Sequence, residues 1–485
     1  MTTEKNGFRV IVAGGGIAGL AMSHALQLAN IDHVVLEAYG DVRSHVGASI
    51  GLWPNGIRVL EQMGCWKQIK SHCAPMVDSY NRLPNGKAIS TSRLADMIKA
   101  RHGYDFVVLE RQLVVASLYD NLPDKSRILV NKRVANVTET SDGVRVDTED
   151  GTTYEGDIVV GCDGVNSTVR DFMWAVANKA IPGYISAQEK RSLATTYACL
   201  IGFAPDMPGM GCGDCHTVHN DGFSFLVITQ PRRTFFFVFI KLPKVIHWPT
   251  RPRFTAEDAE AEAAKLSDLP VSDTVLFGEL WRKRIRGQLI ALEEVVFDHW
   301  HFGRIAILGD SAHKLTINLA FGGNSALEST AALVNGLNRE LKAYPNRKMS
   351  QETISRIFQE YQELRKPRMK RVLNLAYQLT RLQAWDGWFM KFVQRRVIPW
   401  VGDERVADHF ADLVKGGIKL DYVPLPNPPL GTVAWDDDSA KETIANSSIG
   451  KSSNLFLWAL GLILSLNASY YLVSVLRSQY TLQSL

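Results

Sequence analysis

The stretch FRVIVAGGGIAG, Phe8 to Gly19, decides the fold, because a short β-rich run ends there in glycines. Gly14, Gly16 and Gly19 have the G-x-G-x-x-G spacing of a strand-to-helix turn that binds a dinucleotide. The first glycine permits the tight bend, the second lets the backbone approach a pyrophosphate, and the third allows the helix to pack closely on the strand. The phosphates then lie on unpaired N–H groups at the helix start.

Glu37 supports this interpretation. It ends the next predicted strand, HVVLEA at 33–38, where a carboxylate accepts hydrogen bonds from ribose hydroxyls. Strand, glycines, helix, strand and acid follow in order within about 30 residues. The pattern predicts a bound adenine dinucleotide without separating NAD from FAD. The alternative is a tight structural turn followed by a coincidental acid.

The order of the predicted elements indicates an α/β fold. Residues 8–164 alternate strand and helix, which predicts a parallel sheet wrapped by helices. Strand patterns at 195–203, 216–228 and 234–242 predict an antiparallel sheet, in which Phe235, Phe237 and Phe239 share one face. A strand at 303–308 then returns to the first sheet, so we expect the second domain to interrupt the first.

We divide the chain into six parts on this basis. They are the Rossmann-type dinucleotide-binding domain (1–185 and 301–345), an antiparallel-sheet substrate domain (186–300), a C-terminal helical region (346–430), a polar linker (431–454) and a transmembrane helix (455–475). Helices are expected near 324–343, at 350–383 and at 385–397.

The segment 455–475 carries no charge and is long enough to cross about 30 Å of hydrocarbon as a helix. Lys451 precedes it, Arg477 follows it, and Trp458 lies near one end, as in the aromatic belt of a spanning helix. We expect a tail anchor in the endoplasmic reticulum membrane with the catalytic domain in the cytosol. The alternative is an apolar helix docked on the body of the protein.

Composition limits the other function classes. The chain has 485 residues and a net charge of only +4, with no basic module, so no nucleic-acid partner is predicted. The six cysteines are scattered and no signal peptide precedes them, which favours a reducing compartment. The run CGDCH at 212–216 matches half of a zinc site but lacks a second ligand pair, so we predict no metal.

Two distant segments select between the cofactors. GCDGVNSTVR at 161–170 follows the strand DIVV, and GDSAHK at 309–314 follows the strand RIAIL. Together with the glycine turn, these segments resemble the group A FAD-dependent monooxygenases, which include para-hydroxybenzoate and salicylate hydroxylase. The resemblance spans residues 8–426 and implies FAD as cofactor, NAD(P)H as co-substrate and O2 as oxidant.

Three further runs are similar to a fungal branch of this family that epoxidises prenyl chains in meroterpenoid and indole-diterpene pathways. They are GASIGLWPNG at 47–56, RHGYDFVVLER at 101–111 and GGIKLDYVPLP at 416–426. The resemblance therefore implies a lipophilic small-molecule substrate carrying a prenyl or terpenoid chain.

The resemblance also implies roles for individual residues. Gly14, Gly16, Gly19 and Glu37 would hold the ADP part, Gly51 and Arg111 would lie along the cofactor, Asp163 would belong to a second fingerprint that contacts FAD and NADPH, Asp310 would approach the ribityl and pyrophosphate groups, and Gly323 would meet the flavin. Two of these have simpler alternatives. Arg111 is otherwise a surface ion-pairing residue, and Asp310 a cap of the following turn.

The segment 309–324 departs from the family pattern. Ile317, Ala320 and Phe321 stand where proline, glycine and glutamine are usual, and Ser329 replaces a usual aspartate. Alanine does not easily adopt the positive φ that glycine allows, so the flavin environment is expected to differ. This keeps open a flavin-binding protein that redirects cyclisation instead of transferring oxygen.

The expected chemistry depends on the substrate. Epoxidation of an alkene requires an apolar channel and correct orientation rather than a base, and the phenylalanines of the 223–239 sheet either line such a channel or pack the core. An aromatic-ring hydroxylase, the alternative enzyme, benefits from a base that removes a phenolic proton. His219 is the catalytic candidate in that case, unless it is an ordinary strand histidine.

A last pattern lies before the proline-rich segment. Aromatic and basic residues alternate in a way that fits either an amphipathic helix at a membrane interface or a helix packed on the FAD domain. These residues are Trp385, Trp388, Phe389, Phe392, Arg395, Arg396 and Trp400.

Overall fold

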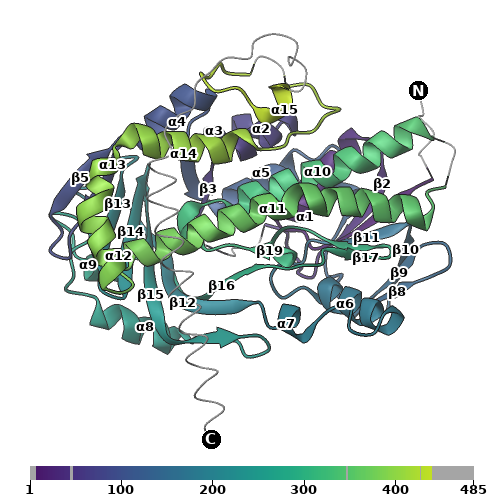
Figure 1. Cartoon of the computed structure of the whole chain (residues 1–485), viewed down its shortest axis with the longest axis horizontal. Coiled ribbons are helices and arrows are strands. Elements are labelled where there is room, and N and C mark those ends of the chain that lie inside the picture. The colour runs from purple at the N-terminus through teal and green to yellow at the C-terminus, as the bar shows by residue number, and fades with distance from the viewer. Residues whose placement is uncertain (1–6, 44–46, 48, 346–347, 426–427, 440–485) are drawn as a thin grey trace, which may run out of the picture.

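The computed structural model describes residues 7–43, 47, 49–345, 348–425 and 428–439. Its two large sheets are covered by helices, and two long helices, α10 and α11, run side by side across the molecule (Figure 1). The fold is α/β, as predicted, and both large sheets are mixed.

The first sheet has six strands in the order β17-β18-β11-β1-β2-β7, and all neighbours are parallel except the edge pair β17 and β18. Its strands are β1 (Arg9–Ala13), β2 (Asp32–Leu36), β7 (Ile128–Leu129), β11 (Ile158–Gly161), β17 (His301–Phe302) and β18 (Ile305–Ile307). The central strands are short runs of valine and isoleucine because both faces of a parallel sheet are buried. Ala13 pairs with Gly161, and Gly161 with Ile307, so β1, β11 and β18 end level at one edge.

Helices cover both faces of this sheet, and their apolar side chains extend its hydrophobic core. α1 and α10 pack against each other, and α11 packs on α10. The helices of this region are α1 (Ile17–Leu28), α2 (Pro54–Gln62), α3 (Trp66–Lys70), α4 (Leu94–His102), α5 (Arg111–Asp120), α6 (Thr168–Ala180), α7 (Ala187–Lys190), α10 (Gly322–Ala343) and α11 (Gln351–Gln383). The helices predicted near 324–343 and at 350–383 are therefore confirmed.

The prediction of a purely alternating parallel unit over 8–164 needs correction. Antiparallel strands interrupt it, namely β3 (Ser49–Leu52) with β6 (Val107–Glu110), and β8 (Val134–Glu139) with β9 (Val144–Thr148) and β10 (Thr153–Gly156). The turn between β9 and β10 contains Asp150 and Gly151, with Gly151 at φ +82°. Asp-Gly pairs favour such hairpin turns, and they were the signal in the sequence for these strands.

The second sheet has eight strands in the order β19-β16-β12-β15-β14-β13-β4-β5. They are β4 (Ser79–Arg82), β5 (Ala88–Ser92), β12 (Ala194–Ala204), β13 (Cys215–Asn220), β14 (Phe223–Gln230), β15 (Arg233–His247), β16 (Arg286–Val296) and β19 (His313–Lys314). The predicted antiparallel sheet is thus mixed, since β4 is parallel to β13, and it extends beyond 186–300. The single run predicted at 216–228 is two strands, because Asp221 and Gly222, at φ +83°, form a hairpin turn.

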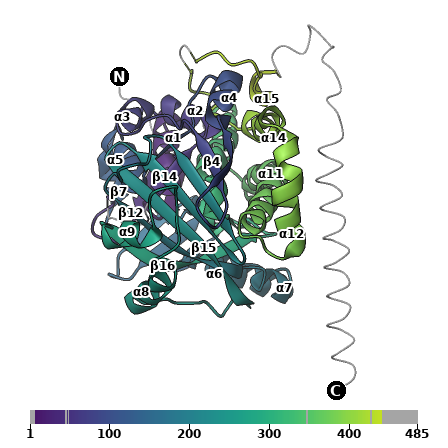
Figure 2. The ribbon, with the colours of Figure 1, turned by 90° about the vertical axis from the view of Figure 1, so that its left-hand side faces the viewer.

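The two faces of this sheet carry different clusters. Phe235, Phe237 and Phe239 share one face, as predicted. We call this the inner face, formed by Tyr197, Cys199, Ile201, Phe203, Leu226, Ile228, Phe235, Phe237, Phe239 and Leu292. The opposite face, with Phe236 and Val238, packs with α8 (Ala256–Lys265) and α9 (Phe277–Arg282). Figure 2 shows α11 and α12 on the other side of the sheet from α8.

The helix predicted at 385–397 begins later than expected. Gly387, at φ +89°, breaks the chain direction, and Trp385 is buried before the break at 3% exposure. The helices that follow are α12 (Trp388–Phe392), the π-helical turn η4 (Val393–Val397), α13 (Ile398–Val401), α14 (Asp403–Lys415) and α15 (Asp436–Ser439).

The predicted transmembrane helix at 455–475 and the linker residues 440–454 lie outside the described residues. None of the helices that the structure describes is long and apolar enough to cross a membrane. The anchor and the localisation stay predictions.

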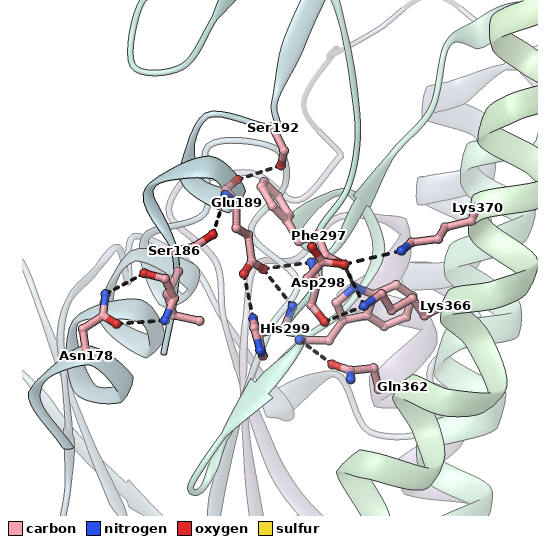
Figure 3. A network of polar contacts seen from close by, with 12 residues as sticks. Asn178, Ser186, Glu189, Ser192, Phe297, Asp298, His299, Gln362, Lys366 and Lys370 are labelled. Atoms are coloured by element: carbon pink, nitrogen blue, oxygen red, sulfur yellow. Dashed lines mark hydrogen bonds and ion pairs between the residues drawn. The ribbon is translucent and has the colours of Figure 1, made fainter. Parts of the chain in front are cut away.

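Glu189 on α7 joins the two places where the chain passes between the sheets (Figure 3). Its side chain is 2% exposed, and its Oε1 accepts hydrogen bonds from the backbone N–H groups of Asp298 and His299, each at 2.8 Å. Its Oε2 lies 2.6 Å from Nδ1 of His299. Lys366 on α11 holds the same loop by donating to the carbonyl of Asp298 at 2.9 Å. The loop at Asp298 and His299, where the chain passes between the two sheets, is therefore held by both α7 and α11.

Replacing Glu189 by alanine should leave three partly buried donors without an acceptor. We expect the free energy of unfolding to fall by about 3 kcal/mol, measured by denaturant titration. Glu262→Ala, which removes only an exposed partner of Lys265, should cost less than about 1 kcal/mol. Equal losses in the two variants would contradict the role of Glu189.

Candidate active site

Three turns that are far apart in the sequence meet at the level edge of the first sheet. They follow β1 (Gly14 to Gly16), β11 (Cys162 to Gly164) and β18 (Gly309 to Ser311). The backbone N–H of Cys162 donates to the carbonyl of Ala13 at 2.8 Å, and that of Leu308 donates to Gly161 at 2.9 Å. Adjacent parallel strands thus bring together the three motifs that the sequence singled out.

The glycine turn is packed too closely for side chains. Gly14 has φ +101°, and a Cβ added there would lie 2.6 Å from the carbonyl oxygen of Cys162. A Cβ at Gly19 would collide with the carbonyl oxygen of Gly14, so α1 sits directly on the turn. Gly16 is the N-cap of α1 and provides no side-chain cap. The first N–H groups of α1 are therefore not capped by the side chain of the N-cap residue.

Glu37 lies at the end of β2, where the sequence places it. One oxygen accepts a hydrogen bond from the N–H of Gly15 at 2.5 Å, and the other accepts from the N–H of Tyr39 at 2.9 Å. The residue is 9% exposed. Since a carboxylate oxygen has more than one lone pair, Glu37 can hold the glycine turn and still accept from a ribose hydroxyl.

Arg111 and Asp310 supply opposite charges at this edge. A Cβ at Gly16 would lie 3.8 Å from Nη2 of Arg111, so the guanidinium is beside the start of α1. Burial lowers the pKa of Arg111, and the charge of Asp310 opposes that shift. Burial would raise the pKa of Asp310, but its ion pair with Lys314 holds the pKa below its ordinary value. Arg111 is thus positioned for a phosphate, and Asp310 forms a charge pair rather than a simple turn cap.

Asp163 is used by the protein itself. Ser167 Oγ donates to its Oδ1 at 2.5 Å, and the N–H of Val169 donates to its Oδ2 at 3.0 Å. Burial raises the pKa of this carboxyl group. The carboxylate therefore fixes the start of α6 against the turn, and its predicted contact with FAD and NADPH stays a prediction.

Arg170, one turn into α6, connects the second and third turns. Its Nη1 donates to the carbonyl of Ser311 at 3.1 Å, and its Nη2 donates to the carbonyl of Val165 at 3.0 Å. Ser311 Oγ in turn donates to Gly161 at 2.6 Å. Arg170 is 2% exposed. The motif at 161–170 includes Arg170 but predicts no role for it, because only the fold shows that its side chain reaches the third turn.

The third turn lies between the first turns of two helices. A Cβ at Gly309 would lie 3.3 Å from the Cβ of Ala18 on α1 and 3.6 Å from that of Ala326 on α10. α10 begins at Gly322 without a side-chain cap, as α1 does. A long ligand can therefore extend from the start of α1, past Gly309, to the start of α10. The positive end of the α10 dipole would then stabilise negative charge at the far end of that ligand.

Gly51 and Gly323 mark this far end. A Cβ at Gly51 would lie 2.5 Å from the Cβ of Ala320, and one at Gly323 would lie 2.5 Å from Cδ1 of Ile50. β3 and the start of α10 thus approach each other closely. Asn324, which the sequence reasoning missed, joins them because its Nδ2 donates to Gly51 at 2.9 Å and its Oδ1 accepts from the N–H of Trp53 at 3.0 Å. Its signal was an amide in the first turn of a helix otherwise rich in small residues.

Ala320 has a backbone conformation that favours glycine. It has φ +54° and ψ +24°, in the left-handed region. The side chain of Asn324 donates to its carbonyl at 2.7 Å, which holds that conformation. Ala320 therefore stores strain in this turn, and the effect of the departure at 317–321 on the flavin environment stays a prediction.

Ser329 also has a structural explanation. Arg365 donates from Nε to Ser329 Oγ at 3.2 Å and pairs with the carboxylate of Glu328, the residue before it. Arg368 contributes a second pair with Glu328 at 2.8 Å. Although burial opposes the charged form, these two guanidinium groups lower the pKa of Glu328 to about 2. Glu328 thus provides the negative charge next to Arg365 that Ser329 lacks.

His219 lies on β13, but its ring is occupied. It is 1% exposed, with Nδ1 3.0 Å from the carbonyl of Gln383 and Nε2 3.0 Å from Nε2 of Gln394. Burial lowers its pKa to about 4. The neutral ring donates from Nδ1 and accepts at Nε2, so it joins β13 to α11 and η4. This geometry favours a structural role over the predicted catalytic one.

The residues at the sheet edge fit FAD. A cradle free of Cβ atoms, a carboxylate for the ribose and a buried guanidinium beside Gly16 suit the ADP half. The second uncapped helix start suits the electron-accepting end of the flavin. Among the described residues, no group of three histidine, cysteine, aspartate or glutamate side chains could hold a metal ion.

Gly14→Ala should disrupt the glycine turn. The added Cβ meets backbone that cannot move away, and strain on the order of 2 kcal/mol would weaken flavin binding about 30-fold. Flavin absorbance of the purified protein measures the loss. Gly151→Ala is the matched control, because Gly151 has φ +82° but a Cβ there meets nothing within 4 Å. Full flavin content in Gly14→Ala would refute this assignment.

Ala320→Gly should relieve the strain in the left-handed turn. We expect the free energy of unfolding to rise by about 1 kcal/mol, because glycine adopts positive φ without steric cost. Ala326→Gly, in the body of α10, should instead lower it by about 1 kcal/mol. Thermal and denaturant unfolding compare the two. A loss of stability in both variants would show that Ala320 is unstrained.

Comparison with known proteins identifies the family. The family described as FAD binding domain matches residues 8–189. The solved structure of HpxO from Klebsiella pneumoniae, complexed with FAD and uric acid, covers 84% of this chain and 97% of its own, with a TM-score of 0.70 and 22% identity. That likeness shows the fold.

Two fungal relatives are closer in sequence. FAD-dependent monooxygenase DEP2 of Alternaria brassicicola is 38% identical over 445 residues, 91% of this chain and 84% of the relative. FAD-dependent monooxygenase penE of Penicillium thymicola is 39% identical over 424 residues, 87% of this chain and 89% of the relative. The chain therefore belongs to the FAD-dependent monooxygenases, with FAD as its cofactor and NAD(P)H as its co-substrate.

Proposed function

We propose that this monooxygenase epoxidises a carbon–carbon double bond in a prenyl or terpenoid chain. The observation that carries the proposal is the inner face, where four phenylalanines and their aliphatic neighbours form one apolar cluster. Ile317, from the turn beside the expected flavin position, packs against this cluster. A hydrocarbon chain lying there would be dry and close to the reactive end of the cofactor.

The reaction balances without a base from the protein. The alkene, O2, NAD(P)H and one proton give the epoxide, NAD(P)+ and water. Bound FAD, once reduced, activates O2 for transfer of one oxygen atom. The protein's own residues hold the chain, exclude water and orient the double bond.

The ionisable groups of the inner face support this view. Burial raises the pKa of the Tyr197 hydroxyl, which donates to Asp386 at 2.9 Å. Burial also raises the pKa of the Cys199 thiol. Both groups therefore stay neutral near pH 7, and neither is available as a base at that pH.

An aromatic-ring hydroxylase is the second candidate, and one observation favours it. Glu294 lies two residues beyond Leu292 on β16, is 8% exposed, and has an Oε1 without a hydrogen-bond partner among the described residues. Burial raises its pKa, and the charge of Arg381 opposes the shift. A buried carboxylate of this kind could accept a phenolic proton.

The left-handed conformation of Ala320, with Asn324 joining its turn to β3, does not select the third candidate, a flavin protein that only redirects cyclisation. A C-terminal membrane anchor at 455–475 completes the proposal, because a prenylated substrate partitions into lipid.

The test is incubation of the holoenzyme with a farnesylated aromatic, NADPH and O2, followed by mass spectrometry of the product. We expect one added oxygen on the prenyl chain. Glu294→Gln and His219→Gln should retain activity within roughly threefold, because alkene epoxidation needs no base. A ring hydroxylase would lose about 100-fold or more in one of them. Oxygen on the ring, or no oxygenated product from several prenylated substrates, would overturn the proposal.

A further inference from the structure

Residues 388–401, which comprise α12, η4 and α13, form an exposed aromatic surface. Trp388 is 79% exposed, Phe392 53% and Trp400 85%. Large aromatic side chains are rarely this exposed, and three on one short segment exceed the scattered apolar residues of an ordinary surface. We call this segment the aromatic segment.

The exposed residues lie on one side of the aromatic segment. Trp388, Phe392, Arg396 and Trp400 follow one another at intervals of four, which places them along one helical face. Met390, Val393 and Gln394 are buried on the other side. The aromatic rings therefore point outward because the opposite face is already packed.

The buried side fixes this orientation at the edge of the inner face. Gln394 lies 3.0 Å from the ring of His219, and that ring is parallel to the indole of Trp385 at 6.0 Å between centroids. Gly387 and Gly402, at φ +89° and +77°, bracket the segment and set its direction. One layer of side chains, formed by Gln394, His219 and Trp385, thus separates the outward face of the aromatic segment from the edge of the inner face.

The charges beside the aromatic rings are positive. Arg395 and Arg396 are exposed, and neither forms an ion pair with a carboxylate in the described part of the chain. Lys391 pairs with Asp221 at 2.7 Å. Tryptophan at headgroup level with arginine next to it is the composition that binds the surface of an anionic bilayer.

We propose that the aromatic segment docks on an anionic membrane surface, with Trp388, Phe392 and Trp400 inserted at the level of the headgroups. The 46 residues from 440 to 485 contain the uncharged stretch 455–475, which would keep the protein at the same bilayer. The docking itself is independent of the reaction. Entry of a lipid-soluble substrate beside His219 rests on the proposed function.

Fluorescence quenching by brominated lipid tests the docking directly. The full chain is added to vesicles of phosphatidylserine and phosphatidylcholine brominated near the headgroup, since simple co-flotation would also report the tail. We expect part of the tryptophan emission to be quenched, and this part to fall in W388F/W400F to the share that Trp458 of the tail contributes. The matched control is W174F/W281F, which removes two buried tryptophans and should retain the quenched part.

Charge is tested with R395Q/R396Q. At low salt we expect this variant to lose the quenching from Trp388 and Trp400 in vesicles containing phosphatidylserine. Wild type should show the same loss in vesicles of phosphatidylcholine alone. Unchanged quenching in W388F/W400F would overturn the proposal, as would quenching that is independent of phosphatidylserine. A change of oligomeric mass in W388S/F392S/W400S without lipid quenching would assign the face to a second copy and also overturn it. A docked but inactive protein would refute only the proposed function.

Discussion

The register of β18, β11 and β1 is the constraint on which the structure depends. Because these parallel neighbours end level, turns separated by about 150 residues along the chain meet at one edge. Arg170 then ties the second turn to the third from a fully buried position. Parallel strands need long crossover connections, and here one of these connections contains most of the second sheet. The inner face is thereby attached to the cofactor edge at both ends of the insertion.

Much of this arrangement could be predicted because short motifs report local backbone needs. Gly14, Gly19 and Glu37 lie where their spacing places them, since a glycine turn and a strand end are determined by neighbours in the sequence. Residues that act across the fold could not be found in that way. Asn324 reaches β3, and Glu189 reaches the loop at 298–299, only after the sheets have formed. The hairpin turns at Asp150-Gly151 and Asp221-Gly222 are not predicted, although Asp-Gly pairs favour such turns. The longer pattern of strands and helices dominates the prediction there.

Residues that depart from the family pattern are best understood from their neighbours in the fold. Ala320 has a left-handed conformation that is costly for alanine, and the hydrogen bond from the side chain of Asn324 to its carbonyl holds that conformation. Ser329 is compensated by Glu328 one position earlier. His219 has its two ring nitrogens in hydrogen bonds, so a strand histidine facing an apolar cluster became part of the packing. In each case the neighbours decide what a residue type means.

The three turns at the cofactor edge describe an enzyme that binds FAD along one edge of its first sheet, and the hydrocarbon chain that we place on the inner face is a proposal built on that edge. The most direct measurement of the central claim is titration of the flavin-free, folded protein with FAD, followed by flavin fluorescence and absorbance. The account predicts saturable binding of one FAD per chain. A folded protein that remains colourless and takes up no flavin would contradict it.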